Sequence, residues 1–169
     1  MIAKPTYDTA LRGYIDLVQH ADACAALHEN TKLFNALLNS LTEEQWMHRY
    51  APHKWSIKQM VQHISDAERI FGYRMIRLLR NDATPLPGYD ENHFADYGHA
   101  DRYSGQELLT EWQHIRHVTT WTLDHAPIDM LDFEGQANGN PVTARAIAFA
   151  MVGHVAHHIT ILHERYGIA

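Results

Sequence analysis

The stretch Gly153-His154-Val155-Ala156-His157-His158-Ile159-Thr160-Ile161-Leu162-His163, near the end of the chain, places several imidazoles within an apolar run that is typical of a helix. His154 and His158 are four residues apart, which puts their side chains about 40° apart on one face of a helix. Two stacked imidazoles can bind one divalent transition metal, but a metal centre needs at least a third ligand. The rest of the sequence must then supply that ligand.

The composition is that of an ordinary globular protein, because 46% of the 169 residues are hydrophobic and 20% are charged. This length favours one domain comprising residues 1–169. The net charge of -6 argues against non-specific binding to nucleic acid, which needs a basic face. The single cysteine, Cys24, excludes an intramolecular disulfide and a cysteine-based zinc site, and we interpret it as a small packing residue.

The N-terminus lacks an apolar core of signal-peptide length. No stretch of the sequence approaches the roughly 18 apolar residues of a membrane span. We therefore expect a cytoplasmic protein that binds a small molecule and contacts neither nucleic acid nor a membrane.

Hydrophobic periodicity predicts four long helices and no convincing strands. The helices span about residues 20–40, 57–80, 105–126 and 143–166. Ser56 and Ser104 each begin a capping box, with a glutamine or glutamate three residues later. A short helical turn is expected around Trp46. Four helices of this kind predict an all-α helical bundle.

Two further segments are expected to lie outside the four helices. Residues 1–19 show no sustained helical period, and we interpret them as an arm that packs along the domain. Residues 82–103 break every pattern and form a long crossover loop, rich in aromatic and polar residues, between the second and third helices. Such a loop can cover a functional site or connect two distant helices, and the two roles are compatible.

His63, on the second predicted helix, lies at the edge of the buried face. On the last helix His154 and His158 face the core, whereas His157 and His163 point outward. Histidines that share an apolar interior must be neutral or bonded, because two imidazolium ions repel and are poorly solvated there. A metal bound by His63, His154 and His158 removes this conflict and leaves one coordination position open, as in catalytic zinc sites. Packing or surface histidines are the alternative, since spacing cannot show that the three meet.

Three charged residues on inward faces are candidates for the pocket around such a site. Arg74 points the same way as His63 on the second helix. Arg116 falls within the apolar face of the third helix, where a guanidinium needs a partner, either in a structural ion pair or in a polar pocket. Glu68 leans inward and is a candidate general base or a partner for a buried arginine, whereas Asp66 favours solvent. No residue is assigned as catalytic.

Three segments of the chain resemble the DinB/YfiT-like family. Trp55-Ser56-Ile57-Lys58-Gln59-Met60-Val61-Gln62-His63, followed by Asp66 and Glu68, resembles the start of its second helix. Gly153-His154-Val155-Ala156-His157-His158, followed by Ile161 and Glu164-Arg165-Tyr166, resembles its last helix. Pro87-Gly88-Tyr89-Asp90 is similar to its crossover loop.

The resemblance implies a four-helix bundle with up-down-down-up topology. It also implies a divalent metal, zinc or nickel, bound by His63, His154 and His158, and it is compatible with a homodimer. The better-understood branches of the family are thiol-dependent transferases, acting with thiols such as bacillithiol, and a mycothiol-dependent maleylpyruvate isomerase. In that scheme the metal would stabilise a thiolate for attack on an electrophilic substrate.

The sequence leaves the type of function open. A metal-dependent transferase of a low-molecular-weight thiol is the first hypothesis. A metal-dependent hydrolase is a second, in which the open position holds a water whose pKa is lowered toward ~7. A non-catalytic, metal-stabilised stress-response or ligand-binding module is a third, favoured by the lack of a compelling acid–base pair. A histidine-rich metal buffer is disfavoured, because outward histidines such as His114 and His157 are dispersed.

Overall fold

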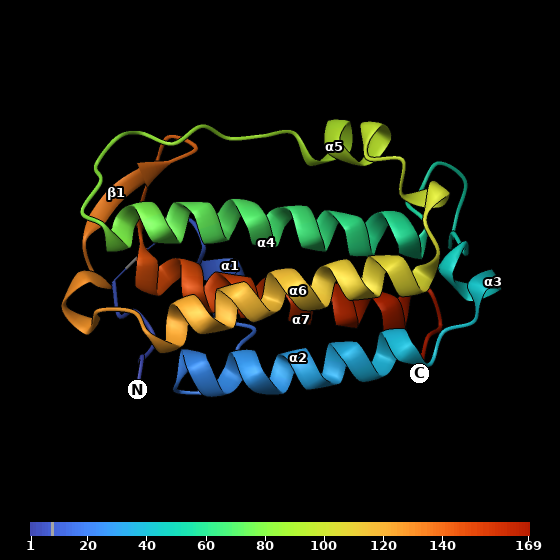
Figure 1. Ribbon diagram of the computed structural model, residues 1–169, viewed down its shortest axis with the longest axis horizontal. Coiled ribbons are helices and arrows are strands. Elements are labelled where there is room, and N and C mark those ends of the chain that lie inside the picture. The colour runs from blue at the N-terminus through green and yellow to red at the C-terminus, as the bar shows by residue number, and fades with distance from the viewer. Residues whose placement is uncertain (8) are drawn as a thin grey trace.

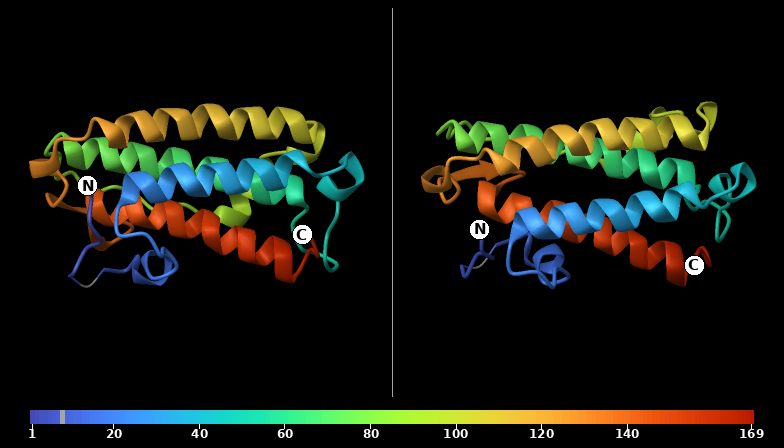
Figure 2. Two further views of the ribbon diagram at one scale, coloured as in Figure 1. Left: turned by 90° about the horizontal axis from the view of Figure 1, so that it is seen from below. Right: turned by 60° about the horizontal axis from the view of Figure 1, so that its bottom comes forward.

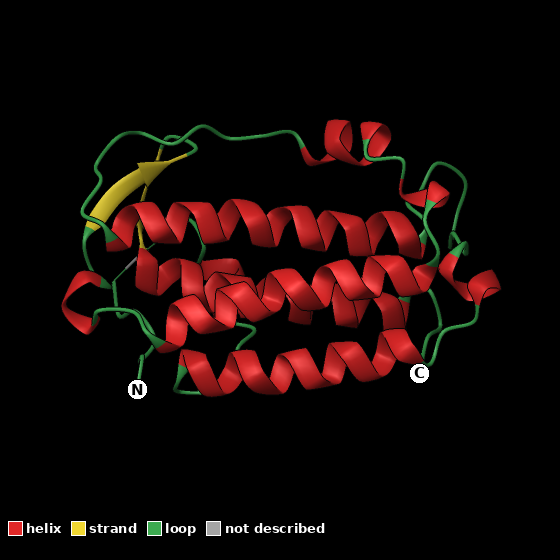
Figure 3. Cartoon of the chain, in the orientation of Figure 1, coloured by secondary structure: helices red, strands yellow, loops and turns green. Residues whose placement is uncertain are grey.

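The computed structural model describes residues 1–7 and 9–169 and consists mainly of a bundle of four long helices (Figures 1 and 3). These helices are α2 (Ala23–Asn39), α4 (Ile57–Leu79), α6 (Gly105–Asp124) and α7 (Ala144–Glu164). Their bounds agree to within a few residues with those that the periodicity predicts. Both predicted capping boxes form, because the Ser56 and Ser104 hydroxyls accept hydrogen bonds from the backbone N–H groups of Gln59 and Glu107. These caps determine where α4 and α6 begin.

The helices α4 and α6 run in one direction, whereas α2 and α7 run in the other (Figures 1 and 2). A connection between two neighbouring parallel helices must return along the length of a helix, about 35 Å for α4. The chain between α4 and α6 makes this return along the outer side of α4 (Figure 1). It contains α5 (Glu91–Tyr97) and a short 3-10 helix (Ala100–Arg102), which are too short for periodicity to reveal. A further short helix, α3 (Glu43–Trp46), forms the turn expected around Trp46.

A two-stranded antiparallel hairpin corrects the prediction that the chain has no strands. A short 3-10 helix (Ile128–Met130) precedes it, and its strands are β1 (Glu134–Ala137) and β2 (Asn140–Thr143). Asn138 and Gly139 form the turn with positive φ angles, a conformation for which Asn-Gly is preferred. The crossover segment binds the hairpin, since Leu86 donates a backbone hydrogen bond to Gln136 and accepts one from Asn138. Strands of four residues are too short to give a clear alternation in the sequence.

The N-terminal segment lies against the last helix. It contains the short helix α1 (Arg12–Ile15), which packs on α7. Ile2 and Val18 bury their side chains in the bundle. A Cβ atom on Gly153 of α7 would lie 2.0 Å from the Tyr14 carbonyl oxygen, so glycine is what permits this close approach. Of the predicted arm, residue 8 lies outside the described residues.

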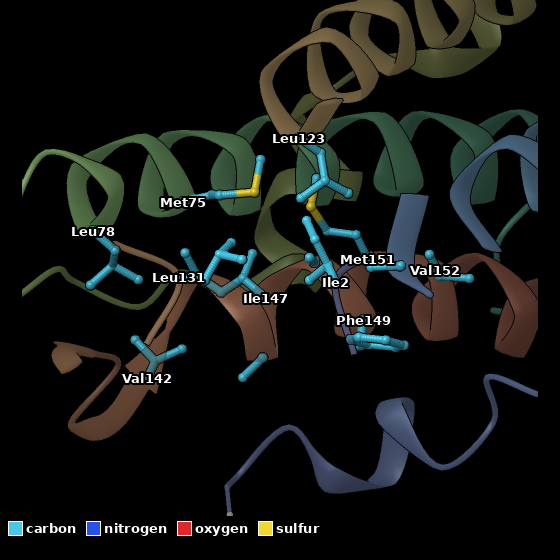
Figure 4. Packing of buried hydrophobic residues seen from close by; sticks show 14 of the residues in the cluster. Ile2, Met75, Leu78, Leu123, Leu131, Val142, Ile147, Phe149, Met151 and Val152 are labelled. Carbon is cyan, nitrogen blue, oxygen red and sulfur yellow. The ribbon is translucent and has the colours of Figure 1, made fainter. Parts of the chain in front are cut away.

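Two clusters of buried hydrophobic side chains fill the bundle. In the first, near the hairpin, Met75 of α4, Leu123 of α6 and Ile147 of α7 belong to one packed group (Figure 4). The second, toward the other end, includes Phe34 of α2 and Trp112 of α6, whose ring centroids are 5.1 Å apart. The helix α7 contributes to both clusters and therefore runs through the centre of the core.

The helix α7 is long and apolar enough to cross a membrane by length and composition alone. The prediction that no stretch approaches a membrane span is therefore wrong for this segment. Within the bundle, 67% of its most apolar window is buried, and a helix that is hydrophobic on all sides is typical of a core position. The core packing accounts for its apolar character.

Three of the tryptophans divide between the core and the surface. Trp46 and Trp112 are buried in the core, whereas Trp121 on α6 is 59% exposed. Its exposed ring stacks on His125, with 4.5 Å between the ring centroids. The homodimer stays a prediction.

Candidate metal centre

Three histidines from two helices converge between the two hydrophobic clusters. The Nε2 atom of His154 lies 3.1 Å from Nε2 of His63 and 3.2 Å from Nε2 of His158. One ring nitrogen from each of the three histidines lies within 4.8 Å of the other two. His154 and His158 are buried and His63 is partly buried, whereas His157 and His163 are exposed. The structure brings together the trio that helical geometry selects, although 91 residues separate His63 from His154.

Neighbouring apolar residues determine where these imidazoles point. On α4, Val61 and Ile64 on either side of His63 are fully buried, which leaves His63 at the edge of the buried face. On α7, Val155 and Leu162 are fully buried and hold the face that carries His154 against the bundle. Because α4 and α7 are packed neighbours, the two faces meet.

The electrostatic environment keeps all three rings neutral at pH 7. Burial lowers the pKa of His63 to about 4. Burial, together with the nearby rings of His63 and His157, lowers the pKa of His158 to about 3. The pKa of His154 is well below its ordinary value because of burial first, and then the neighbouring histidines. The Nε2 atom of a neutral imidazole carries either one N–H or one lone pair. His154 Nε2 therefore cannot form full hydrogen bonds with Nε2 of both His63 and His158 at once.

These residues fit a divalent metal ion. Three neutral imidazoles directed at one point supply three lone pairs to a cation, which removes the conflict between their nitrogens. With metal–nitrogen distances of about 2.0–2.1 Å, neighbouring ligand atoms of a tetrahedral site lie about 3.3–3.4 Å apart. The observed separations of 3.1 and 3.2 Å are close to this value. Imidazole ligands suit both zinc and nickel, and three of them leave a position open.

Aromatic side chains surround the three histidines. The ring centroid of Trp55 lies 4.9 Å from that of His63. The rings of Tyr14 and Phe71 contact His154 from other sides, with centroids 5.3 and 6.1 Å away. An apolar shell of this kind limits access of water and lowers the local dielectric. Periodicity did not assign Tyr14 and Trp55 to the site, because Tyr14 lies in the N-terminal segment and Trp55 precedes a helix.

The crossover segment adds a carboxylate near the histidines. Burial lowers the pKa of His63, whereas it raises the pKa of Tyr14 and raises that of Tyr89 to about 12. The negative charge of Glu91 is a further cause that raises the pKa of each of these three groups. Glu91 itself is exposed, in the first turn of α5, and its charge acts on these groups at and beside the site. No pattern in the sequence linked it to the histidines, because only the return path of the crossover brings α5 alongside α4.

Two of the predicted pocket residues instead form a structural ion pair. Arg116 Nε lies 3.1 Å from Glu68 Oε1, and Arg116 Nη2 donates a 3.1 Å hydrogen bond to Glu68 Oε2. Both side chains are at most 2% exposed, and the guanidinium lies 4.3 Å from the Trp112 ring centroid. This pairing is the structural ion pair that the sequence offered as one alternative for Arg116 and Glu68. Asp66, the other candidate base, forms an ion pair with Arg69 at 3.2 Å.

Two cavities flank the histidines along the bundle. One of about 260 Å³ includes His158 itself, with Trp55, Lys54 and Arg165 in its wall. The other, of about 320 Å³, lies beside Phe71 on the hairpin side, and Arg74 is in its wall. Arg74 is thus a predicted pocket residue that lines a cavity next to the site. Glu68 also lines a cavity, of about 360 Å³, on the side of α4 that faces α6.

Comparison with known proteins agrees with this geometry. The family model described as the DinB superfamily matches residues 26–162. No curated protein matches the sequence. Among solved structures, YfiT from Bacillus subtilis, described as a probable metal-dependent hydrolase with an unusual four-helix bundle topology, is similar with a TM-score of 0.73. The two share 19% identity, over 98% of this chain and 94% of that chain, so the likeness is one of fold. Because the family match covers most of its length, the chain belongs to the DinB superfamily.

Proposed function

We propose that this protein is a divalent-metal-dependent enzyme in which His63, His154 and His158 hold one zinc or nickel ion. The convergence of three neutral ring nitrogens within 4.8 Å carries this proposal. Membership of the DinB superfamily supports it. We also propose an up-down-down-up topology for the bundle, which the helix directions in Figure 1 support. When bound, such an ion lowers the pKa of a thiol or water in its open position.

The reaction that we propose is transfer of a low-molecular-weight thiol to an electrophilic substrate. Cavities on both sides of the histidines support a reaction of two substrates. In the cavity that includes His158, Lys54 and Arg165 provide positive charge that suits a polar, anionic thiol. Trp55 and Phe71 would limit entry of water from either side and so favour thiol over water as the nucleophile.

Metal-dependent hydrolysis is the second candidate, and the position of Glu91 favours it. The Glu91 carboxylate acts electrostatically on His63 and Tyr14, and in this candidate it would accept a proton from a water molecule at the site. The description of YfiT as a probable metal-dependent hydrolase points the same way. In this second candidate Glu91 acts as the general base, and its exposed position leaves it open to water.

Metal content tests the site directly. We expect about one zinc or nickel ion per chain in the purified protein by elemental analysis. The H158A variant should lose the metal, because two imidazoles bind a divalent ion far more weakly than three. The H157A variant is the matched control, since His157 is adjacent in sequence and exposed, and it should keep the metal. Unchanged metal content in H158A would contradict the assignment.

Turnover measurements separate the two reactions. We expect the metal-loaded protein to conjugate bacillithiol to 1-chloro-2,4-dinitrobenzene, with loss of this activity in H158A. The E91Q variant should retain thiol conjugation but lose ester hydrolysis if water is the nucleophile. Bound metal with neither activity would instead favour a non-catalytic module. The homodimer and the cytoplasmic location also stay predictions.

A further inference from the structure

The arginine beside Phe71 is buried without an acidic partner. Arg74 on α4 is 9% exposed. Its guanidinium donates a 2.8 Å hydrogen bond from Nη2 to the Pro87 carbonyl oxygen of the crossover segment. Within residues 1–7 and 9–169, no carboxylate lies within ion-pair distance of it. A guanidinium carries five N–H donors and stays charged in proteins, so most of its capacity is unused by the described chain.

This contrasts with the other arginine that α4 meets in the core. Arg116 is even more deeply buried, and Glu68 neutralises it through two contacts of 3.1 Å. Burial of a cation without such a partner is costly. Among the described residues, the unpaired nitrogens of Arg116 are fully buried whereas those of Arg74 are not, so the Arg74 guanidinium can be reached from the adjoining cavity. A structural ion pair therefore explains the burial of Arg116 but does not explain the position of Arg74.

The cavity next to Arg74 has the size and lining of a small-molecule binding site. Its volume is about 320 Å³, in the range of small-ligand pockets. The walls are mostly apolar, formed by side chains such as Phe71, Val142 and Ile147, with a small number of polar groups. The amides of Asn138 and Asn140, at the hairpin turn, are the other polar side chains in this wall.

Two elements connect this cavity to the histidines. On α4, Phe71 lines the cavity and contacts the ring of His154. In the N-terminal segment, Leu11 lines the cavity, and Tyr14, one helical turn later, contacts the same ring at 5.3 Å. His63 and Arg74 are about 16 Å apart along α4, and long helical side chains lean toward the N-terminal end. A ligand bound at Arg74 would therefore extend past Phe71 toward the histidines.

We propose that this cavity binds the carboxylate end of an elongated, largely apolar substrate, with Arg74 as the residue that holds the carboxylate. The planar guanidinium matches a carboxylate with two parallel hydrogen bonds, and the apolar walls cover the carbon chain. The assignment of the ligand as substrate rests on the proposed function, because it places the reacting end of the molecule at the histidines. Arg74 is a specificity residue in this scheme and holds the end that does not react.

Binding of a matched pair of probes tests the proposal. Hexanoate and hexanamide differ in charge but have the same carbon chain, and inorganic phosphate is an anion without one. We expect the purified protein to bind hexanoate about tenfold or more tightly than hexanamide, as is typical of a charge-assisted hydrogen bond. In R74M this preference should fall to about one, and in R74K it should be intermediate because lysine lacks the planar fork. R80M, which removes an exposed arginine from the end of α4, is the matched control and should behave as the parent protein.

The same experiment distinguishes this proposal from the metal assignment. Each variant is checked for its thermal unfolding and its metal content, and the titrations are repeated after chelation, because a carboxylate can also bind a metal. If the preference for hexanoate over hexanamide depends on Arg74 both before and after chelation, the cavity assignment is supported even if no metal is present. Two results with metal-loaded protein would overturn the cavity assignment. One is that R74K or R74M keeps the full preference for hexanoate over hexanamide, and the other is that the protein binds phosphate as tightly as hexanoate.

Discussion

The Nε2 atoms of His63 on α4 and His154 on α7 lie 3.1 Å apart in a part of the bundle where neither ring can gain a proton without a large cost. Protonation would place a positive charge beside a second imidazole and away from water. The same relationship that suits a metal ion therefore makes the metal-free protein sensitive to acid.

We predict that the metal-free protein loses stability as the pH falls from about 6.5 toward about 4. Unfolded histidines titrate near 6.5, whereas the pKa of His63 is about 4 and that of His158 about 3 in the folded protein. Between these values the unfolded chain binds more protons, so acidification favours unfolding, and at pH 5 the free energy of unfolding falls by about 1–2 kcal/mol per histidine.

Urea unfolding of chelated protein at pH 7.5 and 5.0 measures this effect. The other histidines contribute to both samples, so the informative quantity is the difference between the parent protein and the H63Q/H158Q variant. We expect the pH dependence to be smaller in the variant. An equal change in both proteins would show that these two rings do not titrate as their burial indicates.

A second prediction concerns the contact between Gly153 and Tyr14. In G153A the new methyl group would lie 2.0 Å from the Tyr14 carbonyl oxygen, so α1 must move away from α7. We expect destabilisation by about 1–3 kcal/mol, as in overpacked cores, together with loss of the Tyr14 contact to His154. G13A is the matched control, because nothing lies within 4 Å of a Cβ atom there. Thermal unfolding that is equal in the two variants would contradict the prediction.

A third prediction concerns the buried pair of Glu68 and Arg116. R116M leaves the Glu68 carboxylate buried without its cationic partner, with only the Thr119 side chain as a hydrogen-bond partner, and removal of one member of such a pair costs about 3–5 kcal/mol. The double variant E68L/R116M should recover much of this loss, because apolar side chains leave no charge unpaired. A double-mutant cycle by urea unfolding gives the coupling energy. If R116M alone were neutral, the pair would not have the structural role that its geometry indicates.

A fourth prediction concerns the reactivity of Cys24. Burial, with a contribution from Asp22 and then Asp124, raises the pKa of this half-buried thiol to about 11. Because the thiolate is the reactive form, alkylation by iodoacetamide at pH 8 should be about 100-fold slower in the folded protein than in urea. The rate in the folded protein should still rise about tenfold per pH unit between 8 and 10. Similar alkylation rates in folded and unfolded protein would show that burial does not raise the pKa of Cys24. The C24S variant serves as the blank.

The helices and the inward orientation of the three histidines are the features that periodicity predicts well. In long amphipathic segments with serine caps, the local sequence determines where the helix begins. For this reason α4 and α6 begin directly after Ser56 and Ser104, as predicted. The angular position of His63 relative to Ile64, and of His154 relative to Val155, follows from 3.6 residues per turn. The hairpin and α5 were missed because each element is too short to show a period.

The sequence by itself determined which histidines face the interior of each helix, because that choice depends only on local helical geometry and on neighbouring apolar residues. Only the tertiary structure decided that His63 and His154 meet, and that Glu68 pairs with Arg116 while Arg74 lines a cavity. It also decided that the charge of Glu91, in the crossover segment, acts on His63. These relationships depend on which helices are neighbours and on the path of the connection between α4 and α6. Both are set by packing between segments that are distant in the chain, and no single segment carries that information.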